Sequence, residues 1–69
     1  MNSEKFIIEI RQFEDLATEN GKAWVVDLLD LRGDVIIEGA GVSSDLVSAI
    51  MEAGRDIAYY VAEEAEANA

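Results

Sequence analysis

The chain has 69 residues, of which 15 are acidic and 5 basic, and it contains no histidine, cysteine or proline. A chain of this length makes one domain, residues 1–69, which buries only about 60% of the surface of its unfolded form. Without cysteine or histidine, the sequence has no disulfide framework, no thiolate nucleophile and no proton shuttle near neutral pH. Apolar residues nonetheless make up 51% of the chain, which is typical of a folded protein. The composition therefore argues against an enzyme.

The formal net charge is −10. Self-repulsion of this size destabilises a small compact state, so we expect the charge to serve a function. An acidic surface attracts basic protein surfaces and repels nucleic acid and anionic membranes; the alternative is that the charge only supports solubility. No segment resembles a signal peptide or approaches the ~18 apolar residues of a membrane span. We therefore expect a complete, cytoplasmic gene product with a basic protein partner, no membrane partner and no direct nucleic-acid binding.

Three strands are expected in the first part of the chain. Residues 5–13 and 23–31 are rich in β-branched and aromatic side chains, and residues 35–38 form a shorter run of the same kind. Residues 14–21 allow either a long hairpin closed at Asn20-Gly21 or a short helical turn. Arg32-Gly33-Asp34 predicts a tight turn with positive φ at the glycine. Gly39-Ala40-Gly41 is expected to end the sheet region.

The C-terminal part predicts one helix over about residues 44–65, followed by a frayed tail at 66–69. Ser43 or Ser44 can cap its start, with Asp45 in the first turn, where the helix dipole favours an anion. Steps of three and four residues define one apolar stripe, made of Val47, Ile50, Gly54, Ile57 and Val61. Glycine in mid-helix costs about 1 kcal/mol relative to alanine, so we expect Gly54 to bring the helix close to the sheet.

These elements predict an α+β fold, in which a three-stranded antiparallel sheet carries one C-terminal amphipathic helix packed on one face. Both faces of the strands are apolar, but a single helix covers only one of them. The other face requires residues 14–21, a second copy of the chain in a homodimer, or another partner.

No motif predicts a catalytic, cofactor or metal site. The segment from Gly39 to Ser44 resembles a phosphate-binding loop, but Asp45 stands where the anion would bind and no parallel crossover follows. The acids near the second and third strands do not match a calcium-binding loop. A sheet with one helix also leaves little room for the deep cleft that paired-carboxylate catalysis needs. We expect no cofactor, no metal ion and no enzymatic activity.

The acidic residues of the helix follow a pattern. They step by seven, four, seven and three residues and form one stripe opposite the apolar positions: Asp45, Glu52, Asp56, Glu63 and Glu66. At 1.5 Å rise per residue, Glu52 and Asp56 lie about 6 Å apart along the axis and Asp56 and Glu63 about 10 Å, a charged line similar to a row of phosphates. Four further acids extend the field from the strands: Asp27, Asp30, Asp34 and Glu38. Together these nine predict a partner-binding surface; the alternative is a solvated outer helix face.

Part of the chain resembles a known family. Residues 31–61 (LRGDVIIEGAGVSSDLVSAIMEAGRDIAYYV) resemble the core of HicB-type antitoxins, in which an Asp-Leu-Pro-Gly-like turn is followed by a short strand, a glycine-containing loop and an amphipathic helix. Asp30-Leu31-Arg32-Gly33 corresponds to that turn, with Arg32 at the place of the proline. The resemblance implies an antitoxin module that neutralises a small basic ribonuclease.

The whole profile, a small, acidic, single-domain chain, resembles the inhibitors made by phages and mobile elements, above all anti-CRISPR proteins. That resemblance implies a DNA mimic in the bacterial host cytoplasm. Its acidic surface would dock on the basic channel of a CRISPR effector complex and keep target DNA out. Because no motif defines this class, the choice of site residues depends on the charge pattern alone.

Overall fold

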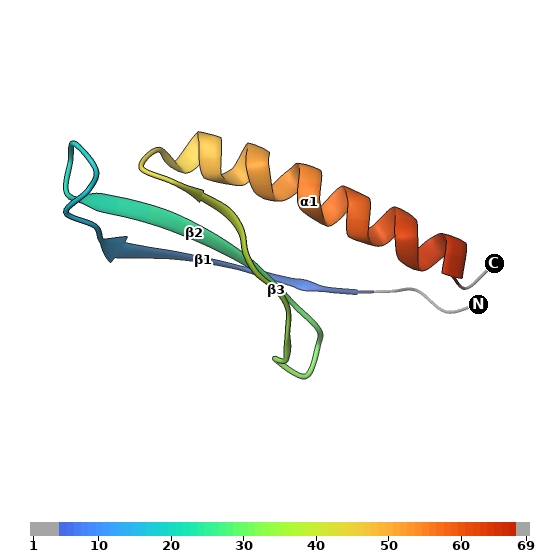
Figure 1. Ribbon diagram of the computed structural model, residues 1–69. Helices are drawn as coiled ribbons and strands as arrows, with labels where there is room; N and C mark the ends of the chain where they lie inside the picture. Colours follow the sequence, from blue (N-terminus) through green and yellow to red (C-terminus); the bar gives the residue numbers. More distant parts are fainter. Residues whose placement is uncertain (1–4, 68–69) are drawn as a thin grey trace.

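The computed structural model describes residues 5–67, which form a three-stranded sheet with one helix lying on it (Figure 1). The strands are β1 (Ile7–Glu14), β2 (Lys22–Leu29) and β3 (Val35–Ser43), and the helix is α1 (Leu46–Ala67). The sheet order is β1-β2-β3, and both strand pairs are antiparallel. The expected α+β fold, an antiparallel meander followed by a C-terminal helix, is confirmed.

β1 and β2 form a hairpin, but its strands do not continue to Asn20-Gly21, and residues 15–21 do not form a helix. The register places Glu14 opposite Lys22, so the strands stop pairing there and residues 15–21 form the loop. Within it, the amide of Asp15 donates to the carbonyl of Gly21 at 2.9 Å, and Gly21 takes a positive φ of 72°. Opposite charges thus face each other where the hairpin closes.

The turn between β2 and β3 has the predicted form. Gly33 takes a positive φ of 91°, as expected for this tight turn. The carboxylate of Asp30 accepts hydrogen bonds from the backbone amides of Arg32 and Asp34 at 2.8 and 3.0 Å. One aspartate side chain therefore satisfies two amides that the turn leaves without a strand partner.

The third strand is longer than predicted. β3 continues through Gly39, Ala40 and Gly41 to Ser43, so the prediction that this segment ends the sheet was wrong. The pairing of β3 with β2 is irregular near Asp27: the register shifts between Val26 and Leu28 and again between Leu28 and Leu29. In this part of β3, Gly39 takes a positive φ of 67°. The Asp27 carboxylate accepts a hydrogen bond from the Gly39 amide at 2.8 Å. A bulge bonded to a side chain thus carries the strand past the glycines.

Small residues make the contact between α1 and the sheet. The buried cluster consists of Val26, Ala40, Ala49 and Ala53, with Trp24, Ile37 and Ile57 packed against it. A Cβ atom on Gly41 would overlap the carbonyl oxygen of Ala49 and lie 2.8 Å from the backbone nitrogen of Ala53. The lack of a side chain at Gly41 therefore allows the helix backbone to approach β3 closely.

The buried face of α1 is rotated from the predicted stripe. Ala49 and Ala53 face the sheet, whereas Val47, Ile50 and Val61 are exposed. A Cβ atom on Gly54 would meet no other atom within 4 Å. The expectation that Gly54 brings the helix close to the sheet was therefore wrong.

The ends of α1 also differ from the prediction. Asp45 precedes the helix as its N-cap, because its carboxylate accepts hydrogen bonds from the backbone amide and hydroxyl of Ser48 at 2.9 and 3.0 Å. It replaces Ser43 or Ser44 in that role and is not in the first turn. The helix includes Glu66 and Ala67, which were expected to fray, and residues 68–69 lie outside the described residues.

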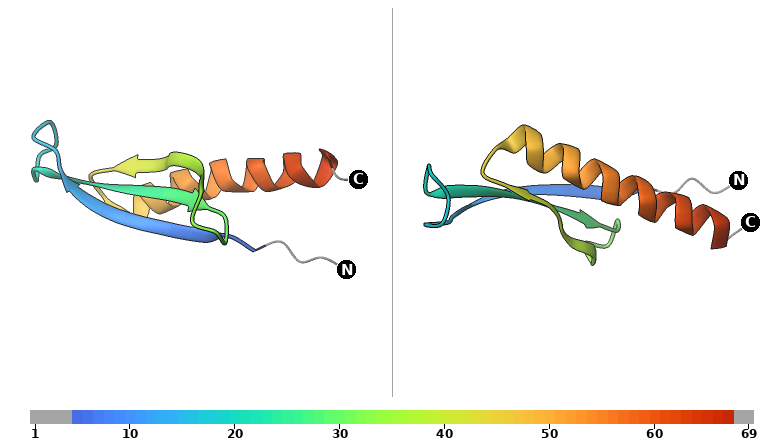
Figure 2. Two further views of the ribbon diagram at one scale, coloured as in Figure 1. Left: turned by 90° about the horizontal axis from the view of Figure 1, so that it is seen from below. Right: turned by 45° about the horizontal axis from the view of Figure 1, so that its top comes forward.

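Within residues 5–67, no helix lies on the second face of the sheet, where neighbouring side chains bury only the β2 residues Ala23, Val25 and Asp27. α1 packs on β2 and β3 but not on β1, and every residue of β1 is exposed (Figure 2). Leu16, the largest apolar residue of the loop after β1, is 94% exposed. Residues 14–21 therefore do not cover the second face, which leaves a second copy of the chain or another partner.

Candidate acidic interface

The Gly41 contact fixes how α1 presents its acidic residues. Ala49 and Ala53 are held against β3, and the predicted acids therefore point to solvent. All five are exposed: Asp45, Glu52, Asp56, Glu63 and Glu66. Within residues 5–67, none of these five carboxylates forms an ion pair. Because Asp45 already caps the helix, we restrict the name acidic stripe to Glu52, Asp56, Glu63 and Glu66.

The acidic stripe is unfavourable for the helix itself. Glu52 and Asp56 are four residues apart, a like-charge spacing that costs a few tenths of a kcal/mol. The last turn of α1 holds no basic residue, although acids near a helix C-terminus are destabilising by roughly 0.3–1 kcal/mol. The C-terminal end of α1 also extends past the ends of the strands (Figure 2). Helix stability does not explain why these acids are here.

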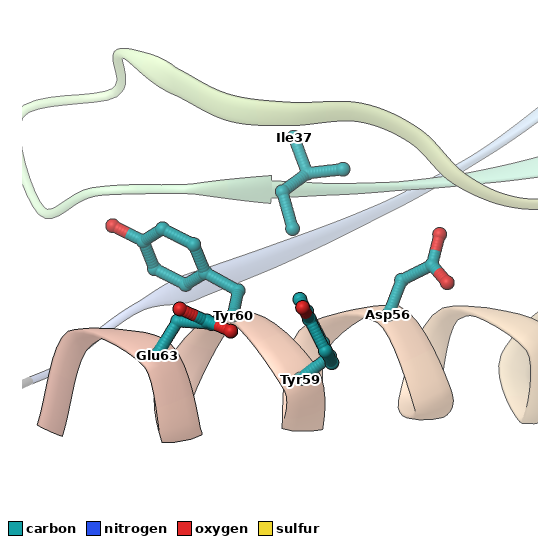
Figure 3. Close-up of a pocket in the computed structure, with 5 residues that line it drawn as sticks. All are labelled: Ile37, Asp56, Tyr59, Tyr60 and Glu63. Atoms are coloured by element: carbon teal, nitrogen blue, oxygen red, sulfur yellow. The ribbon is translucent and has the colours of Figure 1, made fainter. Parts of the chain in front are cut away.

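A pocket of about 330 Å³ lies beside the acidic stripe, between α1 and β3. Asp56 and Glu63 line it together with Ile37, Tyr59 and Tyr60 (Figure 3). Two carboxylates next to aromatic and aliphatic walls suit a lysine or arginine side chain, whose stem prefers apolar contact and whose cation is attracted by carboxylates and aromatic rings. The sequence did not reveal this pocket, because Ile37 lies on β3, far along the chain from the helix residues, and only the fold brings them together.

Asp27 is a correction to the predicted surface. It is only 3% exposed, and its carboxylate accepts hydrogen bonds from Nη2 and Nε of Arg11 at 2.8 and 3.2 Å. Nε of Arg11 also lies 3.3 Å from the carboxylate of Glu9. Asp27 therefore holds β1 to the bulge of β3 and is not available to a partner. The arginine was missed because it is distant in sequence and only the strand register brings it to Asp27.

The remaining strand-side acids form a group separate from the acidic stripe. Asp30 and Asp34 lie in the turn below the sheet in Figure 1, while α1 lies above it, and both acids are near Arg32. The pKa of Asp30 is held below its usual value, first by the hydrogen bond from the Asp34 amide and then by the amide and charge of Arg32. Glu38 is exposed on β3. The nine predicted residues thus do not make one continuous field.

No protein-family model matches the sequence, and comparisons with curated proteins and with solved structures found no similar chain. Across residues 5–67, no group of three or more acidic side chains is arranged to hold a metal ion. Within the described residues, no helix combines the length and the apolar character needed to cross a membrane.

Proposed function

We propose that this protein is an inhibitor that binds, through its acidic stripe, to a basic nucleic-acid-binding surface of another protein and thereby excludes the nucleic acid. The observation that supports this most directly is the row of exposed carboxylates on α1, which form no ion pairs within the described residues. Their cost to the helix is offset if a basic partner neutralises them.

The geometry of α1 suits such docking. A helix is roughly 10–12 Å wide, and the C-terminal end of α1, which extends past the strands (Figure 2), can enter a groove without the sheet following it. The pocket beside Asp56 and Glu63 offers one lysine or arginine of the partner a defined place. Opposed electrostatic fields speed association, and binding of this kind weakens as salt screens the charges.

The first target to test is the DNA-binding channel of a CRISPR effector complex. This choice follows the resemblance of the whole profile to phage anti-CRISPR proteins, which implies action as a DNA mimic. The bacterial cytoplasm would then be the place of action, and the partner would be the basic, lysine- and arginine-lined surface that normally holds target DNA.

The test is competition for DNA binding to purified effector complexes at two salt concentrations. The variant Glu52→Gln/Asp56→Asn/Glu63→Gln should lose at least about tenfold in affinity, because contacts between close opposite charges are removed. The matched control Glu14→Gln/Glu19→Gln/Asp34→Asn removes the same number of exposed charges away from the stripe and should inhibit nearly as well as the parent. Equal loss in both triple variants would show that only total charge matters, and unchanged inhibition by the first would refute the proposal.

A second candidate function is that of an antitoxin module. The order of β2, the Asp30–Gly33 turn, β3 and α1 favours it, since the resemblance to HicB-type antitoxins implies this succession. This function predicts a stoichiometric complex with a small basic ribonuclease, formed over the exposed apolar side chains of β1 and α1. Such a complex should survive high salt, whereas the complex with a nucleic-acid-binding channel should not.

A further inference from the structure

The strand β1 is an exposed sheet edge that contains no lysine, no proline and no bulge, three of the usual protections of such edges. It pairs with β2 in an unbroken register from Ile7 to Glu14, so it has no bulge, and within residues 5–67 no strand pairs with its outer edge. Its apolar side chains are exposed on both faces, including Ile10 at 44%. Natural proteins interrupt such edges with lysine, proline or bulges to prevent pairing with another chain. A long, regular and apolar edge is suited to pairing.

We propose that a second copy of this chain pairs with β1 in antiparallel orientation about a two-fold axis at Ile10, joining the two sheets into one. In this register Ile10 faces its own copy, and Glu9 of each chain faces Arg11 of the other. Ile7 faces Phe13, and Ile8 faces the aliphatic part of Gln12. The strand is thus complementary to itself, as a two-fold symmetric interface requires.

The charges select this register over its neighbours. When two antiparallel strands are related by a two-fold axis perpendicular to the sheet, the residue at the axis faces its own copy. The possible registers therefore differ in which residue of β1 lies at the axis. An axis at Glu9 would oppose two glutamates, and an axis at Arg11 would oppose two arginines; both arrangements are destabilising. Only the axis at Ile10 places Glu9 and Arg11 opposite each other, and it also brings Ile10 against its own copy and Ile7 against Phe13.

Much of the negative charge lies away from the proposed interface, because the acidic stripe is near the edge of the sheet opposite β1. Asp56 and Glu63 share a pocket with Ile37 of β3, which is the opposite edge of the sheet from β1. β1 itself carries two acids and one arginine. Pairing through β1 therefore directs the two acidic stripes away from the two-fold axis and separates them by the width of the joined sheet.

An apolar groove of about 240 Å³ beside β1 supports the same arrangement. Ile8 and Ile10 line it from the strand, and Ile50, Gly54 and Ile57 line it from α1. A two-fold axis perpendicular to the sheet keeps both helices on the same face, so the grooves of the two copies meet side by side. In the single chain, water contacts these apolar side chains of β1 and α1. In the dimer they would lie near the same side chains of the second copy. This inference does not depend on the proposed function.

Sedimentation equilibrium tests the pairing. The unchanged protein should have about twice the 7.5 kDa mass of one chain. Ile10→Lys places two ammonium groups face to face at the axis and should give a monomer with an unchanged circular dichroism spectrum. Val42→Lys is the matched control, because Val42 is also 44% exposed but lies on β3, and this variant should remain a dimer. A monomeric parent protein, or a dimer lost in Val42→Lys but kept in Ile10→Lys, would overturn the proposal.

Single cysteine variants test the register in a chain without native cysteine. Ile10→Cys should form a disulfide-linked dimer under mild oxidation, because residues facing each other across antiparallel strands have Cα atoms about 4.5–5.5 Å apart. Ile8→Cys should not form one, because residue 8 faces residue 12 of the other chain. The two cysteines would therefore lie four residues apart, roughly 14 Å along the strands. Equal cross-linking of both variants, or none with Ile10→Cys, would exclude the two-fold axis at Ile10.

Discussion

Gly41 and Gly54 both lie near the contact between α1 and the sheet, but their surroundings differ. A methyl group on Gly41 would meet the helix backbone, which cannot move aside by changing a rotamer, while one on Gly54 would meet open space. We expect Gly41→Ala to lower the free energy of unfolding by about 3 kcal/mol and Gly54→Ala to raise it by about 1 kcal/mol. Urea unfolding, followed by the fluorescence of the half-buried Trp24, measures both. A gain in stability from Gly41→Ala would show that the helix does not pack as described.

The same residues explain why the buried face of the helix was mispredicted. Hydrophobic periodicity gives most weight to large side chains, so Val47, Ile50 and Val61 defined the predicted stripe. The structure buries Ala49 and Ala53 instead, because a glycine on β3 accommodates a small-residue face. Gly41 is adjacent to Ala53 only through the fold, and no local pattern connects the two.

Among the elements, the β2–β3 turn has a predictable pH dependence. The depressed pKa of Asp30 means that its ionised form stabilises the folded state. This contribution is present above the pKa of the unfolded chain and is lost as the pH falls through the folded pKa. Asp30→Asn should therefore lower the melting temperature at neutral pH, and the difference from the parent should shrink in strong acid. Thermal unfolding over this pH range measures it.

Asp34→Asn is the control for that prediction. Asp34 lies in the same turn, but its side chain is 4.0 Å from Arg32 and accepts no hydrogen bond from the turn's backbone amides. At neutral pH, Asp34→Asn should therefore change the melting temperature less than Asp30→Asn does. A difference between Asp30→Asn and the parent that stays constant from neutral to acidic pH would contradict the role assigned to the Asp30 charge.

The sequence allowed the elements and their order to be predicted, but not all of their limits. Alternation and helical spacing located three strands and one helix within a few residues. They could not locate the end of β3, because Gly39 continues the strand through a bulge bonded to Asp27. They placed Asp27 on the surface because acids are usually exposed, and its partner Arg11 is 16 residues away. The exposure of the helix acids was predictable, since charged side chains are rarely buried without a partner.

Over the whole molecule, the negative charge should act in opposite directions on binding and on stability. Neutralising Glu52, Asp56 and Glu63 removes a like-charge pair and an acid near the C-terminal end of α1, so the free energy of unfolding should rise by about 1 kcal/mol. Urea unfolding at low salt measures this, and high salt should reduce the difference. The control triple variant at Glu14, Glu19 and Asp34 should gain less, because Glu14 faces Lys22 and Asp34 is near Arg32.

A loss of stability on neutralising the acidic stripe would contradict that expectation. It would mean that these carboxylates support the fold, and their role in partner binding would lose its physical basis. A gain in stability together with a loss of inhibition is the combination expected of residues kept for binding.

The pairing of β1 with β2 alone affects how the chain folds during its synthesis. β1 is synthesised before β2, so it has no strand partner until residue 29 has been added. At typical elongation rates of about 5–20 residues per second, the apolar strand waits for a time on the order of a second. β2, β3 and α1 form the core among themselves and are made last. β1 is thus synthesised before all the segments that form the core, and it has to find β2 as that core assembles.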